Sequence, residues 1–193
     1  SGRYGIDVLS PLTEQGCLPL ALHPVMTFTG TSIDLNRLSA CPFGMTTHET
    51  LRPVAETLVV EIGGEPVWVP EASRSLYHAA LTFGANNIMT LVNQTSELLS
   101  SAGIEHPESL VAPLFSASLD NALRNGDAVL TGPVARGDAG TVKEHLRVLA
   151  NFDPAVSQAY RSMARLTAVR ALAAGTLSPQ LAQDLLEVLA GEL

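Results

Sequence analysis

Two histidines and an asparagine are the candidate catalytic residues of this sequence. His23 follows a continuous apolar run, residues 17–22, which predicts a strand buried on both faces. In open parallel sheets ligands collect at the carboxyl ends of strands, so His23 and nearby Thr27 are placed to contact a substrate or cofactor. The alternative is a loop histidine that hydrogen-bonds the backbone and sets the turn with Pro24.

His78 and Asn86 belong to a polar stripe on an otherwise apolar stretch. At about 100° per residue, one sector of the predicted helix holds His78, Thr82, Asn86, Met89 and Asn93. Facing a cleft, His78 could donate or accept a proton near neutral pH while Asn86 holds a carbonyl or carboxylate. Otherwise the stripe forms a satisfied core network or a helix seam in a dimer.

A third constellation is the Gly-rich segment 130–141, which runs into a predicted helix N-terminus. Free backbone N–H groups, the positive end of the helix dipole and Arg136 together suit a carboxylate or phosphate. We therefore predict that Thr131, Arg136 and Asp138 bind substrate. The alternative is an ordinary connector in which Asp138 caps the helix and Arg136 pairs with a surface acid.

Composition excludes several other classes of protein. The 193 residues are 46% hydrophobic, enough to bury a core, and the net charge of -8 disfavours nucleic acid as a partner. Cys17 and Cys41 lie far apart, which indicates neither a disulfide framework nor a cysteine-based metal site. His48, His106 and His145 lack metal-ligand spacing and are interpreted as surface or capping residues. We expect no metal and a reducing, cytoplasmic compartment.

The longest uncharged stretch, residues 75–96, raises the question of a membrane span. Its His, Asn, Gln, Ser and Thr side chains are too many polar groups for hydrocarbon. The stretch is instead predicted to be a central helix among other helices, and no membrane partner is expected.

The predicted fold class is α/β followed by all-α. Over residues 1–70, short helices alternate with strands at residues 17–22, 43–45 and 66–70, which is typical of a mostly parallel sheet. Over residues 71–193, helices account for nearly everything. The predicted domains are therefore 1–70 and 71–193.

Capping signals delimit the predicted helices. The long helix covers roughly residues 73–102 and ends at Gly103, and the next begins at Pro107 and is broken or kinked at Pro113. Asp138 or Thr141 caps a third. Two further helices open with Asp-Pro and Ser-Pro pairs at residues 153–154 and 178–179.

No GxGxxG, GxxxxGK[ST], HExxH or GxSxG motif occurs in the chain. Several other segments carry a resemblance to a known family: residues 23–28, 41–46, 77–86 and 130–138. There the sequence resembles bacterial two-domain proteins with a Rossmann-like N-terminal domain and a helical C-terminal domain of unknown function 2520. That helical domain is similar to the dimerisation domains of 6-phosphogluconate dehydrogenase, ketopantoate reductase and pyrroline-5-carboxylate reductase.

The resemblance implies that this chain is the C-terminal two-thirds of such a protein, with residues 1–70 completing the Rossmann-like sheet. It also implies NADP or NAD as the cofactor, with the main cofactor-binding motif expected upstream of Ser1. The chain alone should then bind dinucleotide poorly. Members of the wider superfamily present a catalytic Lys with an Asn one turn later, but this helix has no Lys. His78 stands nearest to that role.

Together these observations predict an NAD(P)-dependent oxidoreductase that reduces a small carboxylate, with a ketopantoate-like 2-oxo acid as the suggested substrate. Arg136 would bind the carboxylate, Asn86 would orient the carbonyl, and His78 or His23 would supply the proton. The alternatives are a non-catalytic nucleotide- or metabolite-sensing dimer and a structural dimerisation module. In each case the apolar helix faces predict a homodimer.

Overall fold

The computed structural model describes residues 2–191, and packing divides the chain into two compact units, Ser1–Leu98 and Leu99–Leu193. The first unit holds a small sheet with helices and the second is entirely helical, which confirms the predicted class of α/β followed by all-α. The division lies near the end of one long helix. The predicted domain boundary at residue 70 is set by the type of secondary structure and stays a prediction.

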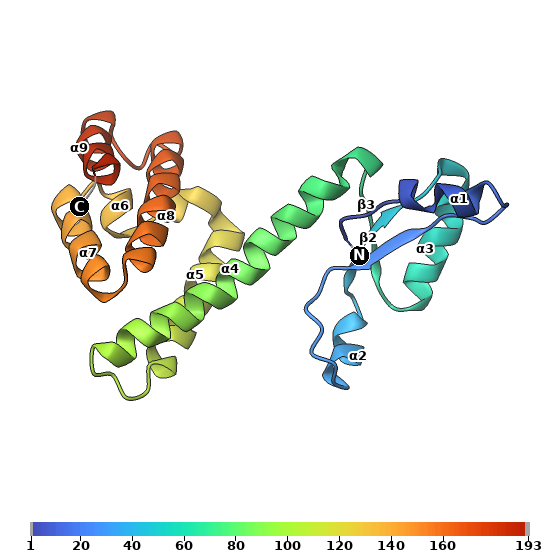
Figure 1. Ribbon diagram of the computed structural model, residues 1–193, viewed down its shortest axis with the longest axis horizontal. Helices are drawn as coiled ribbons and strands as arrows, with labels where there is room; N and C mark the ends of the chain where they lie inside the picture. Colours follow the sequence, from blue (N-terminus) through green and yellow to red (C-terminus); the bar gives the residue numbers. More distant parts are fainter. Residues whose placement is uncertain (1, 192–193) are drawn as a thin grey trace. The chain divides into compact units, whose positions relative to one another are not determined.

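A three-stranded sheet forms the centre of the first unit (Figure 1). Its strands are β1 (Ala21–Pro24), β2 (Pro42–Thr46) and β3 (Glu65–Trp68), in that spatial order. β2 and β3 run parallel, as expected for a Rossmann-like sheet, but β1 runs antiparallel to β2. The sheet is therefore mixed rather than mostly parallel.

The first strand begins later than predicted. Pairing starts at Ala21 and includes His23, whereas residues 17–20 stay outside the ladder. Pro19 lies in that excluded stretch, and its nitrogen has no hydrogen to give to a ladder. The strand is half-buried instead of buried on both faces. His23 consequently lies within the strand and not after it.

Short helices surround the sheet, and one long helix ends the unit. The 3-10 helices are η1 (Asp7–Leu9), η2 (Glu49–Leu51) and η3 (Glu71–Ser73), and the α-helices are α1 (Ser10–Thr13), α2 (Ile33–Leu38), α3 (Arg52–Glu61) and α4 (Arg74–Ser101). α4 ends as predicted before Gly103, which adopts a positive φ of 89°. α2 was not predicted from the sequence.

Successive side chains of β2 point to opposite faces of the sheet. Phe43 and Met45 are buried in a core cluster with Ala55 and Val59 of α3. Gly44 and Thr46 face the other way, toward the first turn of α4. This second face of β2 carries the polar contacts described below.

The second unit is a helical bundle. Its elements are α5 (Glu108–Asn125), η4 (Gly126–Val129), α6 (Gly132–Ala135), α7 (Ala139–Phe152), α8 (Pro154–Ala173) and α9 (Pro179–Ala190). α7, α8 and α9 bury a common apolar core that includes Val142, Leu146, Ala168 and Leu185. Burial of these helical stripes provides most of the stabilisation of the unit.

The predicted caps of this bundle are confirmed. The side chains of Asp138, Asp153 and Ser178 accept backbone N–H bonds at the starts of α7, α8 and α9. α5 continues through Pro113, so a break there is wrong, whereas a kink stays a prediction. Pro113 is exposed, so the carbonyl that its ring leaves without a donor can bind water.

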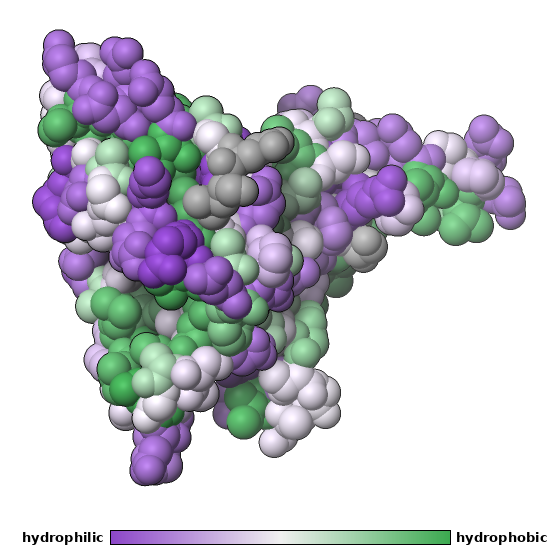
Figure 2. Space-filling model, turned by 60° about the vertical axis from the view of Figure 1, so that its left-hand side comes forward, coloured by the Kyte–Doolittle hydropathy of each residue, from purple (hydrophilic) through white to green (hydrophobic). Residues whose placement is uncertain are grey.

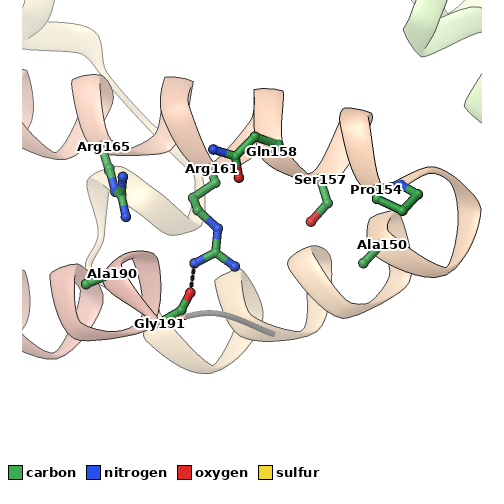
Figure 3. Close-up of a pocket in the computed structure, with 8 residues that line it drawn as sticks. All are labelled: Ala150, Pro154, Ser157, Gln158, Arg161, Arg165, Ala190 and Gly191. Atoms are coloured by element: carbon green, nitrogen blue, oxygen red, sulfur yellow. Dashed lines mark hydrogen bonds between the residues drawn. The ribbon is translucent and has the colours of Figure 1, made fainter.

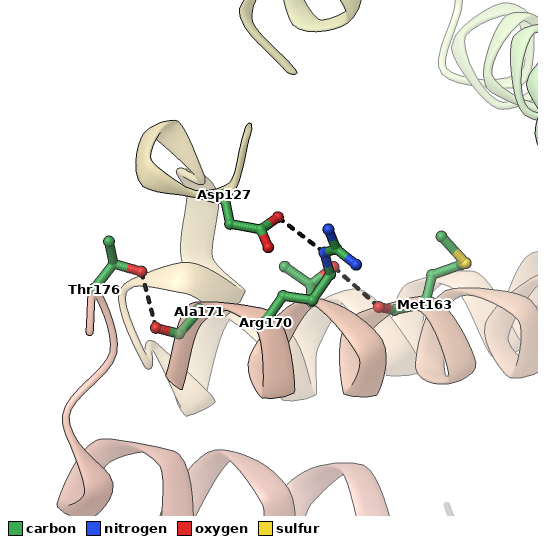
Figure 4. A network of polar contacts seen from close by, with 6 residues as sticks. Asp127, Met163, Arg170, Ala171 and Thr176 are labelled. Carbon is green, nitrogen blue, oxygen red and sulfur yellow. Dashed lines mark hydrogen bonds and ion pairs between the residues drawn. The ribbon is translucent and has the colours of Figure 1, made fainter. Parts of the chain in front are cut away.

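Two arginines of α8 make side-chain contacts with other elements of the bundle. Buried Arg161 donates through Nη1 to the carbonyl oxygens of Leu189, at 3.1 Å, and of Gly191, so it satisfies the end of α9 (Figure 3). Arg170 donates through Nε to Asp127 of η4 at 2.8 Å and remains exposed (Figure 4). The first contact is internal and the second lies at the surface.

Large apolar side chains also remain at the surface, and Figure 2 shows hydrophobic residues beside strongly hydrophilic ones on the face in view. On α4 they are Leu76, Phe83, Ile88, Met89 and Leu91. Despite this apolar character, no helix among residues 2–191 combines the length and hydropathy needed to cross a membrane.

Candidate functional site

A pocket of about 350 Å³ lies within the first unit, at the end of β1 and along α4. It contains four of the predicted site residues, His23, Thr27, His78 and Asn86. Its other lining residues are Val25, Met26, Leu81, Thr82 and Ala85. The segment that follows β1 and the polar stripe of α4, which were predicted separately, therefore line one cavity. Its polar groups lie among apolar side chains.

His23 is held by the residue that precedes His78. Its Nδ1 lies 2.9 Å from the hydroxyl oxygen of Tyr77, and the two rings meet edge to face with centroids 5.7 Å apart. The ring of His78 lies 6.4 Å from that of His23, also edge to face. One turn of α4 thus presents an imidazole and a phenol to the imidazole of β1.

Arg74 anchors that turn of α4 to the sheet. Its guanidinium is buried and donates from Nε to Thr46 Oγ1 at 2.7 Å, and from Nη2 to the carbonyl oxygens of Ala21 and Gly44 at 2.9 and 3.1 Å. Because these acceptors belong to both β1 and β2, Arg74 fixes α4 against the pair of strands that carries His23.

Two glycines provide the space in which His23 and Tyr77 meet. A Cβ on Gly44 would lie 2.2 Å from the Tyr77 hydroxyl oxygen, and a Cβ on Gly2 would lie 2.8 Å from Cε1 of His23. Both distances are far shorter than van der Waals contact. Glycine at positions 2 and 44 is therefore a steric condition of this arrangement.

The surroundings of His23 favour its neutral form. Partial burial lowers the pKa of His23, and the positive charge of Arg74 lowers it further. Burial raises the pKa of Tyr77, with a smaller opposing effect from Arg74. At neutral pH the pair therefore consists of a neutral imidazole and a protonated phenol.

The polar stripe of α4 is not a buried network in the part of the chain that the structure describes. His78 is half-buried at the pocket, whereas Thr82, Asn86, Met89 and Asn93 are exposed. The stripe therefore borders open space. This geometry suits ligand contact at its first two turns.

The predicted anion loop belongs to the second unit. Asp138 caps α7, accepting from Thr141 N at 3.0 Å and Thr141 Oγ1 at 2.7 Å, and these bonds lower the pKa of Asp138. Thr131 precedes the short helix α6, and both Thr131 and Arg136 are exposed. The loop geometry thus gives Asp138 a structural role and leaves Arg136 accessible.

Sequence reasoning missed Tyr77, Arg74 and Gly44 as parts of the site. Their roles depend on contacts between strands and helix that are distant along the chain, so helical periodicity gives no signal for them. One available signal was Arg74, a charge directly before the long uncharged stretch 75–96.

The remaining histidines lie elsewhere. His48 and His106 are exposed, as predicted, but His145 was misassigned because its Nδ1 lies 2.9 Å from the hydroxyl of Tyr160, between α7 and α8. Within residues 2–191, no group of three or more His, Cys, Asp or Glu side chains is arranged to hold a metal ion.

Comparisons with known proteins give the family and the fold. The family described as domain of unknown function (DUF2520) matches residues 41–167, and a Rossmann-like domain family matches residues 1–24. A search of curated proteins gives no match.

Solved structures share the fold. Protein TM1727 from Thermotoga maritima aligns with a TM-score of 0.73 at 23% identity over 90% of this chain and 67% of its own. A Bacteroides fragilis protein described as "putative NADP oxidoreductase BF3122" aligns with a TM-score of 0.69 at 21% identity over 87% of this chain and 62% of its own. This chain thus spans about two thirds of each. With the family match covering residues 41–167, the chain belongs to the DUF2520 family and carries a Rossmann-like segment at its N-terminal end.

Proposed function

We propose that this chain is part of an NAD(P)-dependent oxidoreductase that reduces the carbonyl group of a small carboxylate. One observation carries the proposal: His23, His78 and Asn86, from two separate elements, line a single pocket. Two imidazoles and an amide around an apolar cavity can bind a carbonyl oxygen and move a proton to it.

The comparisons support a nucleotide cofactor. A Rossmann-like family matches residues 1–24, and the B. fragilis protein of similar fold is described as a "putative NADP oxidoreductase". The pocket begins directly after β1, with Val25, Met26 and Thr27 in its wall.

The residues of the pocket fit the nicotinamide end of such a cofactor. Val25, Met26, Leu81 and Ala85 offer an apolar surface for a flat ring, while Thr27 and Thr82 offer hydroxyl groups for a carboxamide. No GxGxxG turn occurs in this sequence, so the groups named here would contact the ring and not the phosphates. A reduced nicotinamide would supply a hydride to the carbonyl carbon of the substrate.

In the proposed reaction, side chains of the pocket supply the proton that accompanies the hydride. As the carbonyl carbon gains the hydride and its electron pair, the oxygen gains a proton from His78 or His23, and the product is an alcohol. Asn86 donates a hydrogen bond that orients the carbonyl. We propose a 2-oxo acid of the ketopantoate class as substrate, because its carbonyl adjoins a carboxylate.

The loop at residues 131–138 is proposed as an anion-binding element in its own right. Arg136 is exposed and Thr131 offers a hydroxyl beside the start of α6. We expect Arg136→Gln to weaken binding of a small carboxylate while leaving the fold intact, because Asp138 still caps α7. Equilibrium titration of the carboxylate into both proteins tests this expectation.

Calorimetric titration of NADPH and NADH into the full-length protein tests the main proposal, followed by turnover with small 2-oxo acids. His78→Ala should lower turnover by at least about tenfold, whereas His106→Ala, at an exposed histidine of the other unit, should not. Full activity of His78→Ala would remove His78 from the mechanism. Cofactor binding without any turnover would favour a sensing protein, which the missing lysine also suggests.

We also propose that the protein is a homodimer. Leu76 and Phe83 of α4 are 74% and 59% exposed, and Leu123 of α5 is 79% exposed. Burying such side chains against a second copy is favourable by about 25 cal/mol per Å². Light scattering at micromolar concentration should give a dimeric mass, and a monomeric mass would contradict the proposal.

A further inference from the structure

The proposed reaction gives no role to Tyr77, although this residue contacts His23 directly. Its hydroxyl lies 2.9 Å from Nδ1 of His23, in a gap that exists because position 44 carries no side chain. The backbone of α4 is held there by Arg74, which bonds both neighbouring strands. Because Gly44 and Arg74 both favour the contact between Tyr77 and His23, the geometry points to a function for this hydrogen bond.

The direction of this hydrogen bond follows from the chemistry of the two groups. A neutral imidazole has one nitrogen that donates and one that accepts, and its bare nitrogen is a far better acceptor than a phenol oxygen. If Nδ1–H donated instead, the phenolic proton would need another acceptor, and the hydroxyl has none among residues 2–191. The O–H of Tyr77 therefore donates to Nδ1 of His23.

The charges around His23 support its neutral state. Within residues 2–191, the titratable or charged groups that face the ring are Arg74, Tyr77 and His78 of α4, and Gly44 of β2 adds none. Of these, Arg74 is a permanent cation, which disfavours a second positive charge beside it. A neutral His23 that accepts at Nδ1 must carry its proton on Nε2.

We propose that Tyr77 is a positioning residue that fixes His23 as the Nε2–H tautomer, so that His23 binds the substrate oxygen as a neutral hydrogen-bond donor. This inference rests on the proposed function and assigns different roles to His23 and His78. A neutral imidazole N–H polarises a carbonyl but is too weak an acid to release its proton. The proton for the substrate oxygen then comes from His78.

The test observes the tautomer directly, without cofactor or turnover. In protein labelled with 15N at histidine, long-range 1H–15N correlation spectra at about pH 8 distinguish Nδ1–H from Nε2–H rings, since neutral imidazole prevails there. His23→Gln assigns the His23 signals. We expect a pure Nε2–H pattern in the native protein and a mixture of tautomers in Tyr77→Phe.

The chain offers a matched control in the second unit. Tyr160 bonds Nδ1 of His145 with the same 2.9 Å distance and the same 5.7 Å ring separation as the pair at the site. Tyr160→Phe should therefore alter the His145 signals and leave those of His23 unchanged. A general loss of structure in Tyr77→Phe would move both sets of signals, so a selective change identifies positioning.

The outcomes separate this inference from the reductase proposal. A native Nδ1–H tautomer, or an unchanged His23 pattern in Tyr77→Phe, would overturn the positioning role and leave the reductase proposal standing. The expected tautomer shift without turnover of any 2-oxo acid would overturn the reductase proposal alone. Where turnover is found, Tyr77→Phe should lower kcat about tenfold with little change in cofactor affinity.

Discussion

Gly44 lies directly opposite His23 in the antiparallel pair of β1 and β2, and the missing side chain at position 44 is what lets Tyr77 reach His23. Gly44→Ala should therefore displace the Tyr77 ring and break its bond to Nδ1. Because the new methyl group would meet a packed ring, we expect the free energy of unfolding to fall by about 1–3 kcal/mol. Urea denaturation measures the loss, and the histidine spectra measure the broken bond.

Gly140→Ala is the matched control for this substitution. A Cβ at position 140 would meet only Asp138 Oδ1, at an ordinary 3.7 Å. The same chemical change should then leave both stability and the His23 signals nearly unaltered. If Gly44→Ala behaved like Gly140→Ala, the steric account of the Tyr77 position would be wrong.

The site shows where sequence reasoning succeeds and where it stops. Helical spacing placed His78 and Asn86 on one stripe, and the apolar run before His23 placed a strand end nearby, so both halves of the pocket were found. Gly44, Arg74 and Tyr77 were not, because the strand register and the packing of α4 on β2 join them. Such non-local contacts leave no periodic pattern in a sequence.

The same contrast between local signals and non-local contacts holds for the fold. Helices with caps, such as those beginning after Asp138, Asp153 and Ser178, were predicted because the capping signal is local. α2 was missed because it is only six residues long and depends on a turn. There Asp34 accepts from the backbone N–H groups of Thr29 and Gly30 at 2.8 and 2.7 Å.

Arg74 should be the most sensitive arginine of the first unit. Arg74→Met removes a buried guanidinium and its hydrogen bonds to Thr46, Ala21 and Gly44, so we expect the free energy of unfolding to fall by about 2 kcal/mol or more. Trp68, the one tryptophan of this sequence, lies on β3 and reports the unfolding of this unit by fluorescence.

Two further variants serve as controls for Arg74→Met. Arg37 of α2 is exposed, so Arg37→Met should change stability by less than about 0.5 kcal/mol. Arg74→Lys keeps the charge but not the planar fork, and it should recover only part of the loss. Equal effects of Arg74→Met and Arg37→Met would show that the buried guanidinium does not anchor α4.

The lowered pKa of His23 predicts a specific dependence of stability on pH. Since the pKa of His23 in the folded state lies below its ordinary value of 6.5, protonation favours the unfolded chain. This contribution to stability is fully present above pH 6.5 and declines as the pH falls from 6.5 toward the lowered pKa. His23→Gln lacks a titrating ring and should lose less stability over that range.

Urea denaturation at about pH 8 and about pH 5 measures the difference between native protein and His23→Gln. Carboxylates and the other histidines titrate in both proteins, so their contributions cancel in the comparison. A pH dependence as steep in His23→Gln as in the native protein would mean that His23 is not held neutral by its surroundings. The neutral donor role inferred for it would then lose its physical basis.

Arg161 and Arg170, on the same helix, offer a test of how burial decides the value of an arginine. Arg161→Met removes a buried guanidinium and its hydrogen bonds to the carbonyl oxygens of Leu189 and Gly191 at the end of α9, and only the bond from Arg165 to Leu189 then remains there among the described residues. We expect the free energy of unfolding of the second unit to fall by about 1–3 kcal/mol. Arg170→Met breaks an ion pair with Asp127 in which the arginine side chain is 63% exposed, and it should cost less than about 1 kcal/mol. Urea denaturation followed by far-ultraviolet circular dichroism compares the two, and a larger loss in Arg170→Met would reverse this ranking.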